Sequence, residues 1–531
     1  MQNRMRYLAR FMVETNTPLS IGSGRGGLLN QRLVAKDANG LPYLPGTALA
    51  GVVRHELEQD EALQAQIDQL FGFQNGENGL GSRITFSSGH LLDENGQTVL
   101  EGLQNIDFSK AYFASFKRLP ERDHVCITDR GVAKKHGKFE EELVHKGTRF
   151  VFEIEMEGTS HDADLWQQIL NILNSEVFRI GAGTRKGFGQ LKVLECQTRQ
   201  FNLEVNADLM AYLSKSSALN APIMGWDNFE STQTGRKWLD YTLELEASNF
   251  FLMGAGLGNE NADMTPKKEK YFVWKPGGGV ELKEHFLLPA TSFKGAIAHR
   301  VAYHYNKLKG ETIEKIAAQE RYLSFDIDAA LKRYQLSYPI EQIESSKAPE
   351  WQLLAAEIEA MDINQSEEWQ TFLDQLQDED ANLQLLPIGA SNNAIKALFG
   401  YTKAKKSRRK NNVQNETQND EEHGARGKVI FSDFYLNPEK IRTKTLNHVA
   451  LDRFTGGARD GALFTEEVSA FSDKIVLEMW VEEDAFVETE IKSAFEKTIE
   501  ELCTGQLQLG GSTNKGHGVF TGSRRSEIQT R

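Results

Sequence analysis

The chain has 531 residues, of which 40% are hydrophobic and 26% charged, and this length exceeds one ordinary core and fits two to four folded domains. Residues 1–11 carry three arginines among apolar residues, so we expect a cytoplasmic protein without a secretory signal, a membrane span or a membrane partner. The three isolated cysteines, with no C-x-x-C spacing, argue against a disulfide framework or a structural zinc site. The net charge of −14 would exclude a nucleic-acid partner only if it were evenly spread. The charge is uneven, because acidic residues far outnumber basic ones between Glu311 and Asp380.

The first half of the chain begins with a strand-like L-A-R-F-M-V that leads to I-G-S-G, ending at Gly24. The segment L-P-Y-L-P-G-T-A-L-A-G then predicts a helix start, because proline followed by a hydroxyl residue and spaced apolar residues is typical of one. L-F-G-F at residues 70–73 and R-I-T-F-S-S-G come next. A helix predicted from Asp164 to Glu176 precedes the glycine-rich R-I-G-A-G-T-R-K-G-F-G-Q-L-K-V at residues 179–193.

The second half repeats these blocks in the same order. M-G-A-G ends at Gly256, and L-P-A-T-S-F-K-G, L-F-G-Y, K-V-I-F-S-D-F and G-G-S-T-N-K-G-H-G follow it. Matched blocks in one order indicate a tandem duplication. We therefore predict a first domain over residues 1–202, a loose linker over 203–237 and a second domain over 238–531.

Each copy reads as strand, helix, strand, strand, helix, strand, which predicts a ferredoxin-like (RRM-like) α+β unit. The second copy carries an acidic segment at about 311–386 with helical periodicity, which predicts either solvated helices or a docking surface for a partner. A polar loop follows at about 403–425 and includes the basic run K-A-K-K-S-R-R-K. We expect this loop to be flexible, because its composition cannot bury a core.

Both glycine-rich loops keep a lysine at the tip, and glycine lets backbone amides approach a phosphate closely. This combination suits a polyanion such as RNA. The dinucleotide-binding and P-loop patterns do not fit, because they follow a strand and open a helix, whereas here a predicted helix precedes the loop and a strand follows it. Tight turns without a ligand remain an alternative.

These blocks together resemble the RAMP superfamily, specifically the backbone subunits of type III CRISPR effector complexes. Two copies on one polypeptide are similar to the fused backbone subunits of subtype III-D systems. The resemblance implies a palm that holds guide RNA, thumb hairpins at residues 116–145 and 443–471 that wedge between bases, and as partners a complementary target RNA and other subunits of the complex. It also implies guide-RNA contacts at the following residues: Arg185, Lys186, Lys294, Lys515, Lys268 and His299. Ala50 stands where the first copy would match Lys294, which departs from the family pattern.

Family members that cleave target RNA use an aspartate in the loop after the first strand, together with Mg²⁺ or another divalent cation. Seven residues past Gly256 is Asp263, whereas seven residues past Gly24 is Gln31, with Asp37 as an alternative in the first copy. The resemblance therefore implies a metal-dependent endoribonuclease whose catalytic and metal-binding residue is Asp263. Two alternatives stay open, a non-catalytic scaffold that binds guide RNA and a guide-processing ribonuclease that uses a histidine without metal.

Overall fold

The computed structural model describes residues 4–26, 32–76, 78–127, 133–223, 225–231, 238–256, 258–310, 392–401 and 424–525. The predicted acidic insertion at 311–386 lies outside the described residues, as does the predicted flexible loop up to residue 423. Within the described ranges, no helix has both the length and the apolar character needed to cross a membrane.

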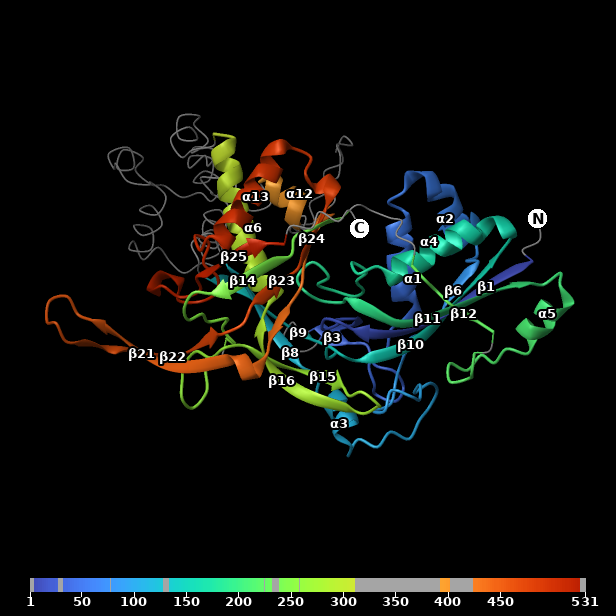
Figure 1. Ribbon diagram of the computed structural model, residues 1–531, viewed down its shortest axis with the longest axis horizontal. Coiled ribbons are helices and arrows are strands. Elements are labelled where there is room, and N and C mark those ends of the chain that lie inside the picture. Colours follow the sequence, from blue (N-terminus) through green and yellow to red (C-terminus); the bar gives the residue numbers. More distant parts are fainter. Residues whose placement is uncertain are drawn as a thin grey trace, which may run out of the picture.

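Each half of the chain forms an antiparallel sheet covered by helices, so the protein is an α+β protein with two similar halves (Figure 1). The principal elements of the first half are β1 (Met5–Thr15), α1 (Gly46–Leu57), β6 (Ile84–Phe86), β10 (Arg149–Gly158), α4 (Ala163–Asn174) and β11 (Leu191–Asn202). Those of the second half are β13 (Trp238–Asp240), β14 (Leu243–Ala247), α6 (Ala290–Leu308), β19 (Val429–Phe431), β23 (Ile475–Leu477), β24 (Met479–Glu482), α13 (Thr489–Cys503) and β25 (Phe520–Arg524).

The two sheets have the same strand order. In the first half the order is β11-β1-β10-β6, so the first strand lies between the last strand and the third. In the second half β14 lies between β25 and β23, and β24 continues β23 after one residue and pairs with β19. The strand–helix–strand–strand–helix–strand order predicted from the repeat is therefore present in both halves.

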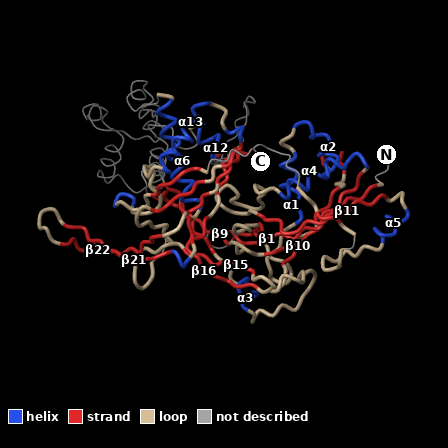
Figure 2. The backbone as a smooth tube through the Cα atoms, in the orientation of Figure 1, coloured by secondary structure: helices blue, strands red, loops and turns tan. Residues whose placement is uncertain are grey.

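Helices cover one face of each sheet, and each half has its own apolar core (Figure 2). Alternate residues of β1 are buried, as expected when one face of a strand packs against helices. In the first core Phe11 stacks on Phe152 with ring centroids 5.1 Å apart. In the second core Tyr241 meets Phe495 edge to face at 5.1 Å. Two separate cores are the outcome expected of a duplicated unit.

Both halves insert a long hairpin between the second and third principal strands, in the two stretches predicted to be thumbs. The first hairpin is β8 (Glu121–Ile127) with β9 (Ala133–Glu142), and the second hairpin is β21 (Ile441–Leu451) with β22 (Ala458–Phe471). The second hairpin protrudes from the body of the protein, at the far end from the first half (Figure 1).

Shorter elements complete the two halves. In the first half they are β2 (Gly22–Gly26), β3 (Arg32–Val34), α2 (Gln64–Phe71), β4 (Phe73–Asn75), β5 (Asn78–Leu80), β7 (His90–Leu91) and α3 (Ala111–Lys117). In the second half they are β15 (Lys268–Trp274), β16 (Val280–Leu288), α12 (Asn393–Phe399), β17 (Gly400–Tyr401), β18 (Ala425–Arg426) and β20 (Phe434–Leu436).

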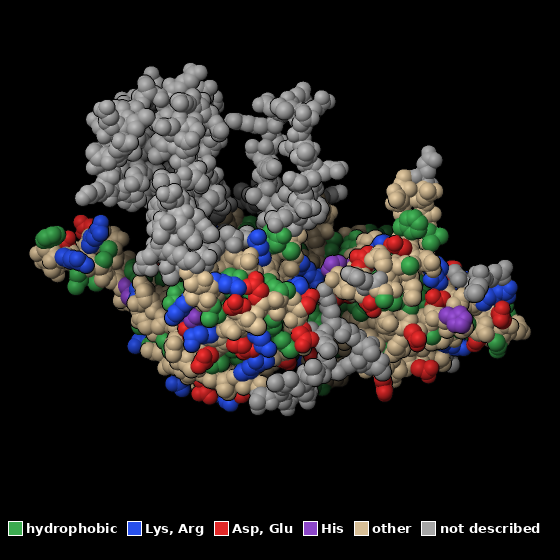
Figure 3. Space-filling view, turned by 90° about the horizontal axis from the view of Figure 1, so that it is seen from above, with side chains coloured by type: hydrophobic (Ala, Val, Ile, Leu, Met, Phe, Trp, Pro, Cys, Tyr) green, Lys and Arg blue, Asp and Glu red, His purple; other side chains and the backbone are tan. Residues whose placement is uncertain are grey.

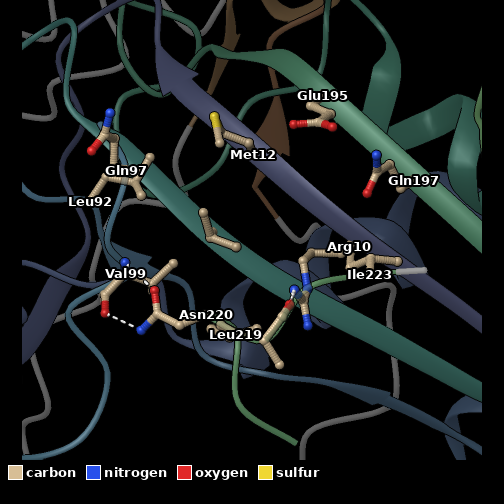
Figure 4. Close-up of a pocket in the computed structure, with 12 residues that line it drawn as sticks. Arg10, Met12, Leu92, Gln97, Val99, Glu195, Gln197, Leu219, Asn220 and Ile223 are labelled. Atoms are coloured by element: carbon tan, nitrogen blue, oxygen red, sulfur yellow. Dashed lines mark hydrogen bonds between the residues drawn. The ribbon is translucent and has the colours of Figure 1, made fainter. Parts of the chain in front are cut away.

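The segment predicted to be a loose linker is partly ordered, with α5 (Asn206–Leu213) and β12 (Asp227–Asn228) within it. The Arg10 guanidinium donates to the carbonyls of Ala218 and Ala221, and the side chain of Asn220 bonds both backbone groups of Val99 (Figure 4). These bonds hold the segment across the open face of the first sheet, where it helps to line a cavity of about 210 Å³. Polar composition alone did not reveal these partners.

The β15–β16 hairpin of the second half packs against the first half. Phe272 contacts the rings of Tyr112 and Phe116 at centroid distances of 5.0 and 5.5 Å. The indole of Trp274 donates to the carbonyl of Gly147 at 2.7 Å. Apolar burial and backbone bonding therefore join the two halves into one body.

A buried ion network lies at the same junction. Arg122, from the first hairpin, donates to both carboxylate oxygens of Glu269 at 2.6 and 2.9 Å and lies 2.7 Å from Asp433. Burial raises the pKa of Asp433, although Arg122 opposes that shift. The Tyr435 hydroxyl donates to Glu269 at 2.7 Å. One guanidinium thus compensates two buried carboxylates.

We predict that Arg122→Ala strongly destabilises the protein, because it leaves Glu269 and Asp433 buried without their cation. Removing one partner of a buried ion pair costs about 3–5 kcal/mol of unfolding free energy. Chemical denaturation would measure this loss. Lys474→Ala is the matched control, because Lys474 pairs with Glu244 at 3.0 Å on the surface, and its effect should be small. Equal stability of the two variants would contradict the role assigned to the network.

Candidate functional site

Each glycine-rich loop connects the second principal helix to the last strand of its half, as predicted. The backbone folds back so closely that a Cβ atom on Gly189 would lie 2.1 Å from the carbonyl oxygen of Ile180. A Cβ atom on Gly518 would lie 2.0 Å from the carbonyl oxygen of Leu509. Both glycines also have positive φ, at 82° and 74°. The tight-turn interpretation therefore accounts for this pair of glycines.

The lysine at the tip of each loop faces a glutamate at the base of a hairpin. Lys186 Nζ lies 2.6 Å from Glu141 on β9, and Lys515 Nζ lies 3.9 Å from Glu466 on β22. Both glutamates are almost completely buried. Each glycine-rich loop is therefore bound to the hairpin of its own half.

A histidine and a phenylalanine complete the same arrangement in both halves. His124 Nε2 lies 3.2 Å from Glu141, and its ring stacks on Phe139 at 5.0 Å. His448 Nε2 lies 2.6 Å from Glu466, and its ring stacks on Phe464 at 4.9 Å. We call these sets the hairpin-base clusters: Glu141, His124, Phe139 and Lys186 in the first half, and Glu466, His448, Phe464 and Lys515 in the second.

The hairpin-base clusters were not predicted from the sequence. Their signal is the recurrence of His-Val in the first strand of each hairpin and of Phe-x-Glu in the second strand. Such short patterns indicate a cluster only when the strand pairing is known, because it is the pairing that places His124 opposite Phe139 and His448 opposite Phe464.

Both buried glutamates are held in the charged state. Burial opposes ionisation of Glu141, but hydrogen bonds from His124 and Lys186 outweigh it and lower the pKa of this carboxyl to about 2. Burial likewise opposes ionisation of Glu466, yet hydrogen bonds from Ser512 and His448 lower its pKa. The Ser512 hydroxyl donates to Glu466 at 2.6 Å.

Two residues predicted to contact RNA, Arg185 and Lys294, lie at the junction of the halves. Arg185 is buried, forms an ion pair with Glu482 of β24 at 3.0 Å and lies 5.4 Å from the Trp238 ring. Lys294, on α6, has no ion pair within the described part of the chain. Burial and repulsion by Lys186 and Arg185 lower the pKa of Lys294 to about 8. Three predicted contacts from two halves therefore meet in one cationic junction.

The start of α6 closes this junction. A Cβ atom on Gly187 would lie 2.7 Å from that of Ala290, so the first glycine-rich loop packs against the helix start. The amide of Ala290 donates to Asp433 at 2.8 Å. No side chain of the helix's own entry turn caps α6, and Asp433 takes that place instead.

Asp263 lies in a compact turn after the first strand of the second half. The Asn259 side chain accepts from the amides of Asn261 and Ala262, which holds the turn closed. The Asp263 side chain is exposed, and its Oδ2 accepts from the amide and the hydroxyl of Thr465, on β22. The predicted residue is thus fixed at the base of the second hairpin.

Strand pairing supports the counting that assigned Asp263. Arg32 of β3 and Met264 each pair in parallel with the buried glutamate of the hairpin-base cluster in their half. Gln31 and Asp263 directly precede these two residues. Gln31 itself lies outside the described residues, so the matched pairing concerns Arg32 and Met264 alone.

The remaining predicted contacts are exposed and separate. Lys268, on β15, extends its ammonium over the Phe286 ring at 4.6 Å, and His299 lies on the exposed face of α6. The structure therefore brings Arg185, Lys186 and Lys294 together, and places Lys515 at the hairpin base beside the Asp263 loop.

The fit of a divalent cation depends on Asp263. Among the described residues, no group of three His, Cys, Asp or Glu side chains is arranged to hold a metal ion. Mg²⁺ is commonly held by one or two carboxylates together with substrate phosphates and water. Asp263 therefore fits a metal ion that a bound nucleic acid also ligates. With the other described residues, it does not form a site made of protein ligands alone.

The second hairpin exposes apolar side chains near its tip. Phe454 is 99% exposed, and Leu451 and Leu463 are about two-thirds exposed. Arg453 and Arg459 lie on the same tip, where Figure 3 shows hydrophobic and basic side chains together. An apolar tip flanked by arginines is suited to bases and phosphates.

Comparison with known proteins agrees with this duplicated architecture. The sequence model of the RAMP superfamily matches residues 12–192 and 277–521, which include both hairpins and the glycines of both glycine-rich loops, whereas β14 and the Asp263 loop lie between the two matched regions. No curated protein matches the sequence. Since the matched regions cover well over half of the residues, the chain belongs to the RAMP superfamily.

Proposed function

We propose that the chain is a backbone subunit of an RNA-guided type III CRISPR complex, in which two ferredoxin-like RAMP domains bind guide RNA and the second cleaves target RNA. Membership of the superfamily supports a CRISPR-associated, RNA-binding subunit that works in a complex. The fused, subtype III-D-like organisation follows from the two copies in one chain. The observation that carries the cleavage proposal is the exposed, anchored carboxylate of Asp263 at the base of the protruding hairpin.

The cationic junction supports binding of the RNA backbone. Lys294 is half-buried beside two other cations, so its charge is costly until an anion approaches. A phosphate group would compensate this charge, and phosphate contacts position a nucleic acid without reading its sequence. This suits a subunit that must accept guides of any sequence.

The hairpins supply the proposed thumbs. Phe454 and Leu451 are exposed at the tip of the second hairpin, where folding alone gives no reason for apolar side chains. An apolar wedge can unstack neighbouring bases at a cost of a few kcal/mol. In the proposed function this wedge opens the duplex along the second hairpin, whose base carries Asp263.

Asp263 would act on the phosphate exposed in this way. Its Oδ2 is engaged by Thr465, so Oδ1 is the oxygen available to orient the attacking 2′-hydroxyl. Lys268 and Lys270 follow within seven residues on an exposed strand and can neutralise the phosphate. A divalent cation held by Asp263 would stabilise the negative charge that develops at the phosphate.

A scaffold without catalysis is the second candidate. It is favoured by the lack, among the described residues, of three His, Cys, Asp or Glu side chains arranged to hold a metal ion. It would bind the same RNA, and the target would stay intact with or without Mg²⁺.

We predict that Asp263→Ala lowers the rate of target cleavage by the assembled complex at least about 100-fold, since a positioned acid or base contributes that much. Cleavage of labelled complementary RNA, with Mg²⁺ and with a chelator, measures the effect. Glu260→Gln is the control, because Glu260 is an exposed carboxylate in the same loop. An unchanged rate in Asp263→Ala would refute the assignment, and no cleavage by the wild type would favour the scaffold.

We also predict that guide-RNA affinity falls as the pH rises above about 8. Phosphate binding stabilises protonated Lys294, whose pKa without RNA is lowered to about 8, so binding requires proton uptake above that pH. The fall is limited to about tenfold per pH unit for one proton. Lys294→Arg keeps its charge and should show a flatter profile with similar affinity at pH 7.

Titration of guide RNA against the purified chain at constant ionic strength, from pH 6.5 to 9.5, tests the role of Lys294. Constant salt is needed because phosphate contacts release counterions. Parallel profiles for wild type and Lys294→Arg would show that Lys294 does not carry the pH dependence.

A further inference from the structure

Asp263 and Thr465 form a reciprocal set of hydrogen bonds. Thr465 donates its amide and its hydroxyl to Asp263 Oδ2, at 2.7 and 3.1 Å. In return, the amide of Asp263 donates to the Thr465 hydroxyl and to its carbonyl, both at 3.0 Å. A single threonine therefore fixes both the backbone and the side chain of an exposed aspartate.

Thr465 and Glu467, on β22, also bond the backbone of Met264, the residue after Asp263. The amide of Met264 donates to the Thr465 carbonyl at 3.1 Å, and the amide of Glu467 donates to the Met264 carbonyl at 2.8 Å. Glu466, the next residue, is buried and bound by Ser512 and His448. The anchor therefore lies beside the hairpin-base cluster and not on the protruding tip.

These hydrogen bonds fix the orientation of the Asp263 carboxylate. An exposed aspartate without partners samples several rotamers, whereas bonds from Thr465 restrict Asp263 to one. Because the amide and the hydroxyl of Thr465 both donate to Oδ2, the other oxygen is left for a ligand. Holding a reacting group in one orientation can change a rate by orders of magnitude.

The first half lacks the same pair of residues. Phe139 and Phe464 are equivalent, because each lies opposite the histidine of its hairpin-base cluster. The residue after Phe139 is Glu140, which therefore occupies the position of Thr465. Glu140 lies 3.2 Å from Lys138 and so makes a surface ion pair. The aspartate and its threonine anchor are therefore both absent from the first copy.

We propose that Thr465 is a positioning residue for Asp263, which couples the orientation of the cleavage carboxylate to the base of the second hairpin. This inference rests on the proposed function of Asp263. It assigns a role to the hydroxyl group of Thr465 that goes beyond stabilising the turn.

The test uses the assembled complex with guide RNA and complementary target RNA. Thr465→Val removes the hydroxyl with little change in shape, and Thr465→Ser retains it. We expect the single-turnover cleavage rate of Thr465→Val at saturating target to fall about tenfold, because a hydrogen bond to a charged group is lost. Target affinity should stay unchanged, and Thr465→Ser should cleave within about twofold of the wild type.

Controls separate this proposal from the one on which it rests. Thr445→Val changes an exposed threonine on the neighbouring strand of the same hairpin and should cleave like the wild type. If Asp263→Ala abolishes cleavage while Thr465→Val cleaves normally, only the positioning role fails. If Asp263→Ala cleaves normally, the proposed function fails first. Equal losses in Thr465→Val and Thr465→Ser would also overturn the role of the hydroxyl, and Thr465→Ala replaces the valine variant should that variant not assemble.

Discussion

The buried glutamate at the base of each hairpin is the constraint on which the two halves depend. A charged carboxylate with almost no exposure is tolerated only when cations and hydrogen-bond donors surround it. Glu141 and Glu466 each obtain these from a histidine on the facing strand and a lysine on the glycine-rich loop. Hairpin, loop and sheet must therefore take one relative position, and this requirement explains why lysine recurs at the loop tip.

The same arrangement has different surroundings in the two halves. In the first half, Arg122 lies beside the cluster and binds Glu269 and Asp433 of the second half, so this face is used in joining the halves. In the second half, Leu446 occupies the position of Arg122, opposite Glu466 in the strand register. The second cluster thus stays at the surface beside Asp263, and divergence of the copies has separated a joining face from a potential ligand face.

The sequence predicted the duplicated order of elements and both hairpins, because these follow from repeated blocks. It could not predict partners that meet only in the fold. Lys186 and Arg185 were predicted as guide-RNA contacts, and their ion pairs with buried acids from other elements were not predicted. The cap of α6 comes from Asp433, 143 residues away along the chain. Long-range side-chain pairing leaves no periodic signal in a sequence.

Lys294 shows how stability and the proposed function can oppose one another. Burial and like charges lower its pKa to about 8, so a charged Lys294 destabilises the junction when no anion is present. A hydrophobic residue would relieve this cost, and Ala50 stands at the matching position in the first copy. Retaining an uncompensated lysine beside Arg185 is understandable if a ligand supplies the missing negative charge. In the proposed function, a phosphate of the guide RNA does so, and RNA binding then stabilises the contact between the two halves by linkage.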